Sequence, residues 1–163
     1  MTRDLHHVVL RLLPWALALW IAYVFVWYLQ YKFTGHEGSV WLFTVLTDWL
    51  GLHGHEKAMR IGTGAAELLA AVLCLVPPLR AVGAAMTVGI MAGAIFFHLV
   101  TPLGIDPYGD GGVLFREACL TLVAGAVLLW LSRQQALTIA RALPVVGPLV
   151  ERLCPGRFAA RMG

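Results

Sequence analysis

Charged residues are scarce in this sequence. Only 13% of its 163 residues are Asp, Glu, Lys or Arg, whereas 60% are hydrophobic and the mean hydropathy is +0.78. A soluble globule of this length cannot bury so much apolar surface, so the composition excludes a soluble fold and predicts that lipid surrounds the chain. The formal net charge of +3 comes from basic residues at helix ends and gives no support to nucleic-acid binding.

Cysteine pairs and cofactor motifs are also lacking. The three cysteines are far apart, and no C-x-x-C pattern exists, which excludes the paired-thiol chemistry of disulfide-generating quinone enzymes. No flavin, haem or iron–sulfur motif is present. Haem held by two histidines needs both at matching depth on facing helices, and only His98 lies within an apolar stretch.

Four apolar stretches are long enough to cross a bilayer, at residues 12–31, 58–76, 81–100 and 113–131. A hydrocarbon core of about 30 Å needs about 20 helical residues. We therefore predict an all-α protein, an antiparallel bundle of four transmembrane helices over residues 1–132. The first stretch has no small-residue cleavage pattern before Lys32, so we interpret it as a retained helix and not as a signal peptide.

The segments outside these stretches have distinct patterns. Residues 39–52 are apolar on one helical face but too short to cross, which predicts a short interfacial helix or lid at the outer face, or else a loop helix with no gating role. Residues 133–163 form an Arg-rich amphipathic tail suited to an anionic membrane surface.

The basic residues predict the orientation of the bundle. By the positive-inside rule, both termini are cytoplasmic. The predicted cytoplasmic ends carry Arg3, Arg11, Arg80, Arg133, Arg141, Arg152, Arg157 and Arg161, and the outer ends carry only Lys32, Lys57, Arg60 and Arg116.

Glu67 is the most informative residue, because it falls in the middle of the second apolar stretch. A carboxylate near the centre of a bilayer costs about 3 to well over 10 kcal/mol, so it persists only with a partner, a proton or a function. The predicted helices place several other polar groups in the outer half of the bundle. We predict a polar funnel with Glu67, His98 and Glu117 as catalytic candidates and Lys32, Arg60 and Arg116 as cofactor-binding candidates.

Structural explanations stay open for the same residues. Arg60 or Arg116 could pair with Glu67 or Glu117 simply to fix helix register. His98 could bond a backbone carbonyl at a helix end. His53 and His55 form an H-x-H pattern beside Glu56 that suits a metal ion, but H-x-H in a loop is a less specific signal than H-E-x-x-H, and solvated loop histidines give the same pattern.

Three segments together resemble the DoxX-like family of small four-helix membrane proteins. These are K-F-T at 32–34, G-T-G-A-A-E-L-L at 62–69, and the run from Arg80 to H-L-V-T-P at 98–102. The resemblance covers about residues 12–132. It implies a bacterial inner-membrane protein, often encoded with redox partners. Some family members are subunits of thiosulfate:quinone oxidoreductase, and others are linked to oxidative-stress resistance. The family's recurring Lys and Glu map onto Lys32 and Glu67.

Three function classes follow. In the first, the chain is a quinone-linked redox subunit in which the quinone carbonyls meet His98 and Arg116 or Lys32, and Glu67 or Glu117 exchanges protons. Because no redox motif is present, it needs a partner subunit as electron donor. In the second, it is a non-catalytic accessory or assembly subunit of a larger membrane complex. In the third, it is a small metal-handling or transport protein that uses the outer histidines.

Overall fold

The computed structural model describes residues 2–142, and the side chains of residues 11–139. Within this part of the chain every regular element is helical: α1 (Thr2–Thr34), α2 (Glu37–Trp49), α3 (Glu56–Leu75), the 3-10 turn η1 (Pro77–Leu79), α4 (Arg80–Val100), α5 (Val113–Leu131) and α6 (Arg133–Ala142). Most of the predicted Arg-rich tail, residues 143–163, lies outside the described residues.

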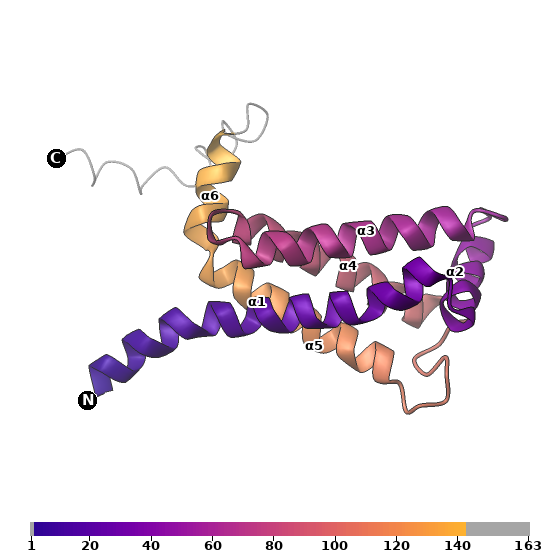
Figure 1. The fold of residues 1–163 in the computed structure, drawn as a ribbon, viewed down its shortest axis with the longest axis horizontal. Coiled ribbons are helices and arrows are strands. Elements are labelled where there is room, and N and C mark those ends of the chain that lie inside the picture. The colour runs from indigo at the N-terminus through magenta and orange to yellow at the C-terminus, as the bar shows by residue number, and fades with distance from the viewer. Residues whose placement is uncertain (1, 143–163) are drawn as a thin grey trace.

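Four of these helices are long and apolar enough to cross a membrane. The candidate spans are Arg11–Thr34, Glu56–Leu75, Pro77–Val100 and Val113–Leu131. The predicted all-α bundle of four membrane-spanning helices is therefore confirmed, and the chain is a multi-pass membrane protein. Figure 1 shows the start of α1 and α6 at one end of the bundle and α2 at the other. We call these the α6 end and the α2 end.

The first helix is longer than the sequence predicts. It begins at Thr2 and not near residue 12, and it continues through Pro14. Proline removes one backbone hydrogen bond and usually kinks or ends a helix. The loss of one bond near the start of a 33-residue helix does not end it, because a segment entering lipid must satisfy its backbone groups internally.

Glycine allows α3 and α4 to pack at very short range. A Cβ atom at Gly83 would lie 2.5 Å from the backbone nitrogen of Cys74 and 2.8 Å from the carbonyl carbon of Leu73. Gly125 similarly brings α5 against Thr87 of α4. Small residues at helix contacts are the usual means of close packing in lipid.

The α2 end is closed by α2 and by the loop before α5. Phe43 and Leu46 of α2 pack with Leu103 in a small apolar cluster of their own. The Tyr108 hydroxyl donates to the Gly38 carbonyl at 3.0 Å and so fastens the loop to the start of α2. Asp106 shapes this loop: backbone N–H groups, chiefly that of Gly112, lower the pKa of its carboxyl group.

At the opposite end, α6 lies against the turn between α3 and α4. The Gln135 side chain donates to the Pro77 carbonyl at 2.8 Å and accepts from the Ala81 amide at 3.0 Å. These two bonds satisfy backbone groups that a proline-containing turn and a helix start leave without partners. The predicted tail thus begins as a helix docked on the bundle.

The glycine contact between α3 and α4 gives a direct stability test. Gly83→Ala forces the two backbones apart, so we expect a loss of about 1–3 kcal/mol, the usual cost of overpacking. Gly62→Ala is the matched control, because a side chain there meets no atom within 4 Å. Thermal unfolding in detergent should show a lower midpoint for Gly83→Ala only. Equal midpoints for the two variants would contradict the close packing.

Candidate functional site

A cavity of about 600 Å³ lies in the α2 half of the bundle. All four membrane-spanning helices line it, α2 covers it, and the loop before α5 contributes Leu103, Tyr108 and Asp110. Its walls are mostly apolar and include Phe25, Phe43, Met59, Met91, Phe97 and Leu114. Such a volume and lining are typical of small-molecule sites.

Two glycines of α4 help to keep this space open. Gly89 and Gly93 both line the cavity, and a side chain added at either position would meet no atom within 4 Å. They are four residues apart and so share one face of α4. A larger residue at either position would therefore reduce the volume of the cavity.

Glu67 forms an ion pair with Lys32 at the cavity wall. The Lys32 Nζ atom, at the end of α1, lies 2.8 Å from Glu67 Oε2 in the middle of α3. The exposed fractions of the two side chains are only 12% and 6%. Their charges are close, but the Oε2 atom makes no hydrogen bond of ordinary geometry. The pair gives Glu67 a counter-charge inside the bundle.

Glu117 has a different partner. The Tyr28 hydroxyl of α1 donates to Glu117 Oε2 of α5 at 2.6 Å. The Lys32 Nζ atom lies 5.5 Å from the centre of the Tyr28 ring, within the range of a cation–π contact. Glu67, Lys32, Tyr28 and Glu117 therefore form a continuous polar row from α3 across α1 to α5.

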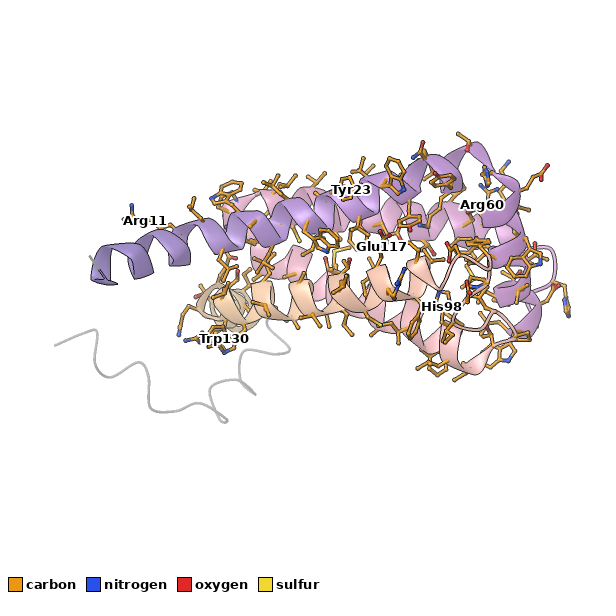
Figure 2. All side chains as sticks on the ribbon, turned by 90° about the horizontal axis from the view of Figure 1, so that it is seen from below. Arg11, Tyr23, Arg60, His98, Glu117 and Trp130 are labelled. Carbon is orange, nitrogen blue, oxygen red and sulfur yellow. The ribbon has the colours of Figure 1, made fainter. Side chains whose placement is uncertain are left out.

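His98 lines the cavity close to the α2 end. Its Nδ1 atom lies 2.6 Å from the Gly104 carbonyl oxygen. Because a carbonyl can only accept, Nδ1 carries the hydrogen, and a neutral His98 has its lone pair on Nε2. This bond fixes the ring and leaves Nε2 as a proton acceptor. Figure 2 shows His98 and Glu117 in the α2 half of the bundle, with Trp130 at the opposite end.

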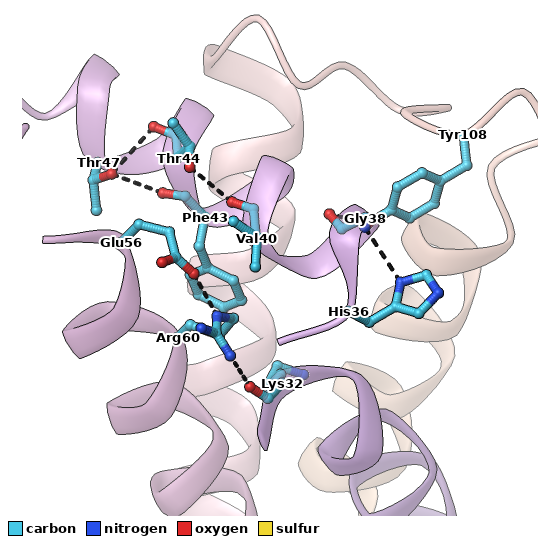
Figure 3. Close-up of polar contacts among 10 residues, drawn as sticks. All are labelled: Lys32, His36, Gly38, Val40, Phe43, Thr44, Thr47, Glu56, Arg60 and Tyr108. Atoms are coloured by element: carbon cyan, nitrogen blue, oxygen red, sulfur yellow. Dashed lines mark hydrogen bonds and ion pairs between the residues drawn. The ribbon is translucent and has the colours of Figure 1, made fainter. Parts of the chain in front are cut away.

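The two arginines of the predicted funnel do not line the cavity. Arg60 is 6% exposed, and its guanidinium group bonds the Glu56 carboxylate and the Lys32 carbonyl (Figure 3). Arg116 is exposed on α5. The alternative in which Arg60 or Arg116 pairs with Glu67 or Glu117 is therefore wrong, because Glu67 pairs with Lys32 and Glu117 pairs with no basic side chain among the described residues. Arg60 instead satisfies a carbonyl at the end of α1, where a helix leaves its last carbonyls without partners.

His53 and His55, the two histidines of the predicted metal site, do not line the cavity. His53 Nδ1 is 2.8 Å from Asp48 Oδ1, and His55 Nδ1 is 3.1 Å from the His53 carbonyl oxygen. The side chain of His53 is 74% exposed. Within the described part of the chain, no group of three or more His, Cys, Asp or Glu residues could hold a metal ion. The predicted metal pair therefore has no third ligand of these types among the described residues.

Sequence reasoning missed Tyr28, Tyr31, His36, Tyr108 and Asp110, all of which line the cavity. A signal for Tyr28 was present, because it lies four residues before Lys32 and so on the same face of α1. The loop residues had no such signal, since the path of a loop does not follow from periodicity.

The site can thus hold an amphipathic molecule against apolar walls and offer it donors and acceptors for protons. Lys32, Glu67, His98 and Glu117 are brought together, and Tyr28 connects them. Comparisons with family models, curated proteins and solved structures give no match for this chain. Its chemistry is therefore inferred from this geometry.

The buried ion pair predicts strong coupling between two substitutions. Lys32→Met leaves the Glu67 carboxylate buried without a counter-charge, which we expect to cost about 3–5 kcal/mol. Adding Glu67→Leu removes that charge and should restore most of the stability. Unfolding of the single and double variants in detergent measures the coupling. If the losses of stability caused by Lys32→Met alone and Glu67→Leu alone simply add in the double variant, the ion pair contributes nothing to stability.

Proposed function

We propose that this chain is a DoxX-like inner-membrane protein that binds a quinone, as a membrane subunit of an oxidoreductase. The observation that carries the proposal is the apolar cavity with a single row of polar groups along one side. A quinone is an apolar ring with two carbonyl acceptors, and it enters from lipid. The cavity offers apolar walls to the ring and hydrogen-bond donors to the carbonyls.

The polar row matches the proton requirement of the reaction. Reduction of a quinone to a quinol takes two electrons and two protons. Glu67 and Glu117 are carboxyl groups that exchange protons, and Nε2 of His98 accepts one. Lys32 and Tyr31 supply donors toward the carbonyl oxygens. The electrons come from a redox centre on a partner subunit, because the sequence carries no flavin, haem or iron–sulfur motif.

The distribution of charge supports an orientation. The α6 end carries Arg3, Arg11, Arg80, Arg133 and Arg141, whereas the α2 end carries Lys32, Lys57, Arg60 and Arg116. The sequence after α6 adds three more arginines, at positions 152, 157 and 161. By the positive-inside rule, the α6 end faces the cytoplasm and the cavity lies toward the outer face.

An aromatic row on α1 supports a second candidate function, that of an accessory subunit docked against a larger membrane protein. Trp20, Tyr23 and Trp27 follow one another along an exposed face, with ring centres 6.3 Å and 6.2 Å apart. Tyr23 is 58% exposed, and its hydroxyl bonds no residue in the described part of the chain. A hydroxyl near the middle of a span favours a protein neighbour that supplies an acceptor. This face also suits the partner that the redox proposal requires.

Filling the cavity tests quinone binding without removing a polar group. Gly93→Leu places a side chain in open space at the wall, so we expect binding of decylubiquinone to fall at least tenfold. Gly62→Leu, on the exposed face of α3, is the matched control and should bind normally. Quenching of tryptophan fluorescence by the quinone in detergent measures both affinities. Binding that survives in Gly93→Leu would place the quinone elsewhere.

Polar substitutions test the roles of the individual groups. Glu67→Gln and His98→Ala should each weaken quinone binding about tenfold, the effect of one lost hydrogen bond of roughly 1–1.5 kcal/mol. Arg116→Gln, on the exposed face of α5, should change nothing. The measurement is the quinone that remains bound after mild purification, determined by mass spectrometry. Full occupancy in both site variants would refute the proposed role of these groups.

Site-specific cross-linking tests the partner face. A photoreactive residue at Tyr23 should cross-link to a redox subunit in native membranes, whereas one at Val123, which is 61% exposed on α5, should react mainly with lipid. Gel shifts followed by mass spectrometry of the adducts give the result. Equal labelling at the two positions would argue against a docking role for the aromatic row.

A further inference from the structure

The residues that line the cavity carry an unequal number of charges. Glu67, Glu117 and Asp110 are acidic, and Lys32 is the one lysine or arginine among the lining residues. His36 and His98 also line the cavity, and they add no negative charge. An apolar cavity inside a membrane protein with this lining attracts positive charge, because charges in a low-dielectric site interact strongly.

Lys32 balances only one of the three acidic groups, because it pairs with Glu67. Its Nζ atom lies 2.8 Å from Glu67, while the distance from Nζ to the Tyr28 ring centre is 5.5 Å. No ion pair joins Glu117 to any basic side chain described between residues 11 and 139. Its hydrogen-bond donor is the neutral Tyr28 hydroxyl. Glu117 is thus a carboxyl group within a span that has no counter-charge among these described residues.

The aromatic and apolar side chains of the walls favour one kind of cation. Aromatic rings line the cavity on several sides, contributed by α1, α2, α4 and the loop before α5: Trp27, Tyr28, Tyr31, Phe43, Phe97 and Tyr108. Ring faces attract cations, and apolar walls cannot replace the hydration shell of a small inorganic ion. A cation whose charge is spread over apolar groups loses little hydration on entry and fits this lining.

We propose that the cavity binds a hydrophobic organic cation, for which Glu117 supplies the counter-charge. This inference goes beyond the proposed quinone site. The other ionisable groups that line the cavity with Glu117 are Tyr28, Tyr31 and Lys32 of α1, His36 at the start of α2, Glu67 of α3, His98 of α4, and Tyr108 and Asp110 of the loop.

The test uses tetraphenylphosphonium as the probe and the full chain purified in detergent. Isothermal titration should give saturable binding, with about one cation bound per chain. Tetraphenylborate, an anion of the same shape, should not bind saturably.

Three variants locate the site. Glu117→Gln keeps the size of the side chain, removes its charge and should weaken tetraphenylphosphonium binding at least tenfold. Glu37→Gln, exposed in the first turn of α2 and absent from the cavity lining, is the matched control and should bind normally. Tyr28→Phe removes the hydroxyl that bonds the carboxylate but keeps the carboxylate itself, so it should retain binding. This variant keeps the test informative if Glu117→Gln fails to fold.

Each contrary result overturns the inference. These results are the absence of saturable binding to wild type, equal binding by wild type and Glu117→Gln, equal binding of tetraphenylborate, or loss of binding in Tyr28→Phe with an intact fold. Decylubiquinone is titrated into the same preparations. Quinone binding without cation binding overturns this inference alone, and cation binding without quinone binding overturns the proposed function alone.

Discussion

The ion pair between Lys32 and Glu67 is the contact that the other features of the site depend on. A carboxylate in the middle of α3 must be neutralised in lipid, and the lysine that reaches it fixes the last turn of α1 against α3. Gly64 brings the same two helices close, since a Cβ atom there would lie 2.9 Å from Phe33. Arg60 holds the Lys32 carbonyl and so ties α1 to α3 a second time. With α1 held in this way, Tyr28 is placed one turn earlier, where it meets Glu117.

The cavity exists because the helices around it are held at their ends and do not close on its centre. At the α2 end, Phe43, Leu46 and Leu103 form a separate apolar cluster, and the bond from Tyr108 to Gly38 fastens the loop beneath α2. Toward the α6 end, the glycine contact at Gly83 brings α3 and α4 together. Between these two regions, Gly89 and Gly93 present no side chain. The result is open volume beside a row of charged groups, an arrangement that costs stability unless a ligand fills it.

The sequence predicted the fold because hydropathy and length decide which segments span a membrane. It also singled out Lys32, Glu67, His98 and Glu117, since polar groups in apolar stretches are conspicuous. It did not predict which cation meets Glu67. Arg60 is on the same helix stripe as Glu67, but the unsatisfied carbonyls at the end of α1 attract its guanidinium group more directly. Arg116 is next to Glu117 in sequence, and adjacent residues point about 100° apart on a helix, so it faces outward. Tyr28 was missed because an aromatic residue in a span is usually a packing residue.

The two acids of the polar row, Glu67 and Glu117, differ in the kind of partner that the fold gives them. Lysine carries a full positive charge, so Glu67 has a counter-charge within the protein. A tyrosine hydroxyl donates a hydrogen bond but carries no charge, so Glu117 has no counter-charge among the described basic side chains. The quinone proposal uses both acids. The cation proposal depends on Glu117, because a bound cation supplies the charge that the fold does not. Glu67 has a second role, since its ion pair holds α1 against α3.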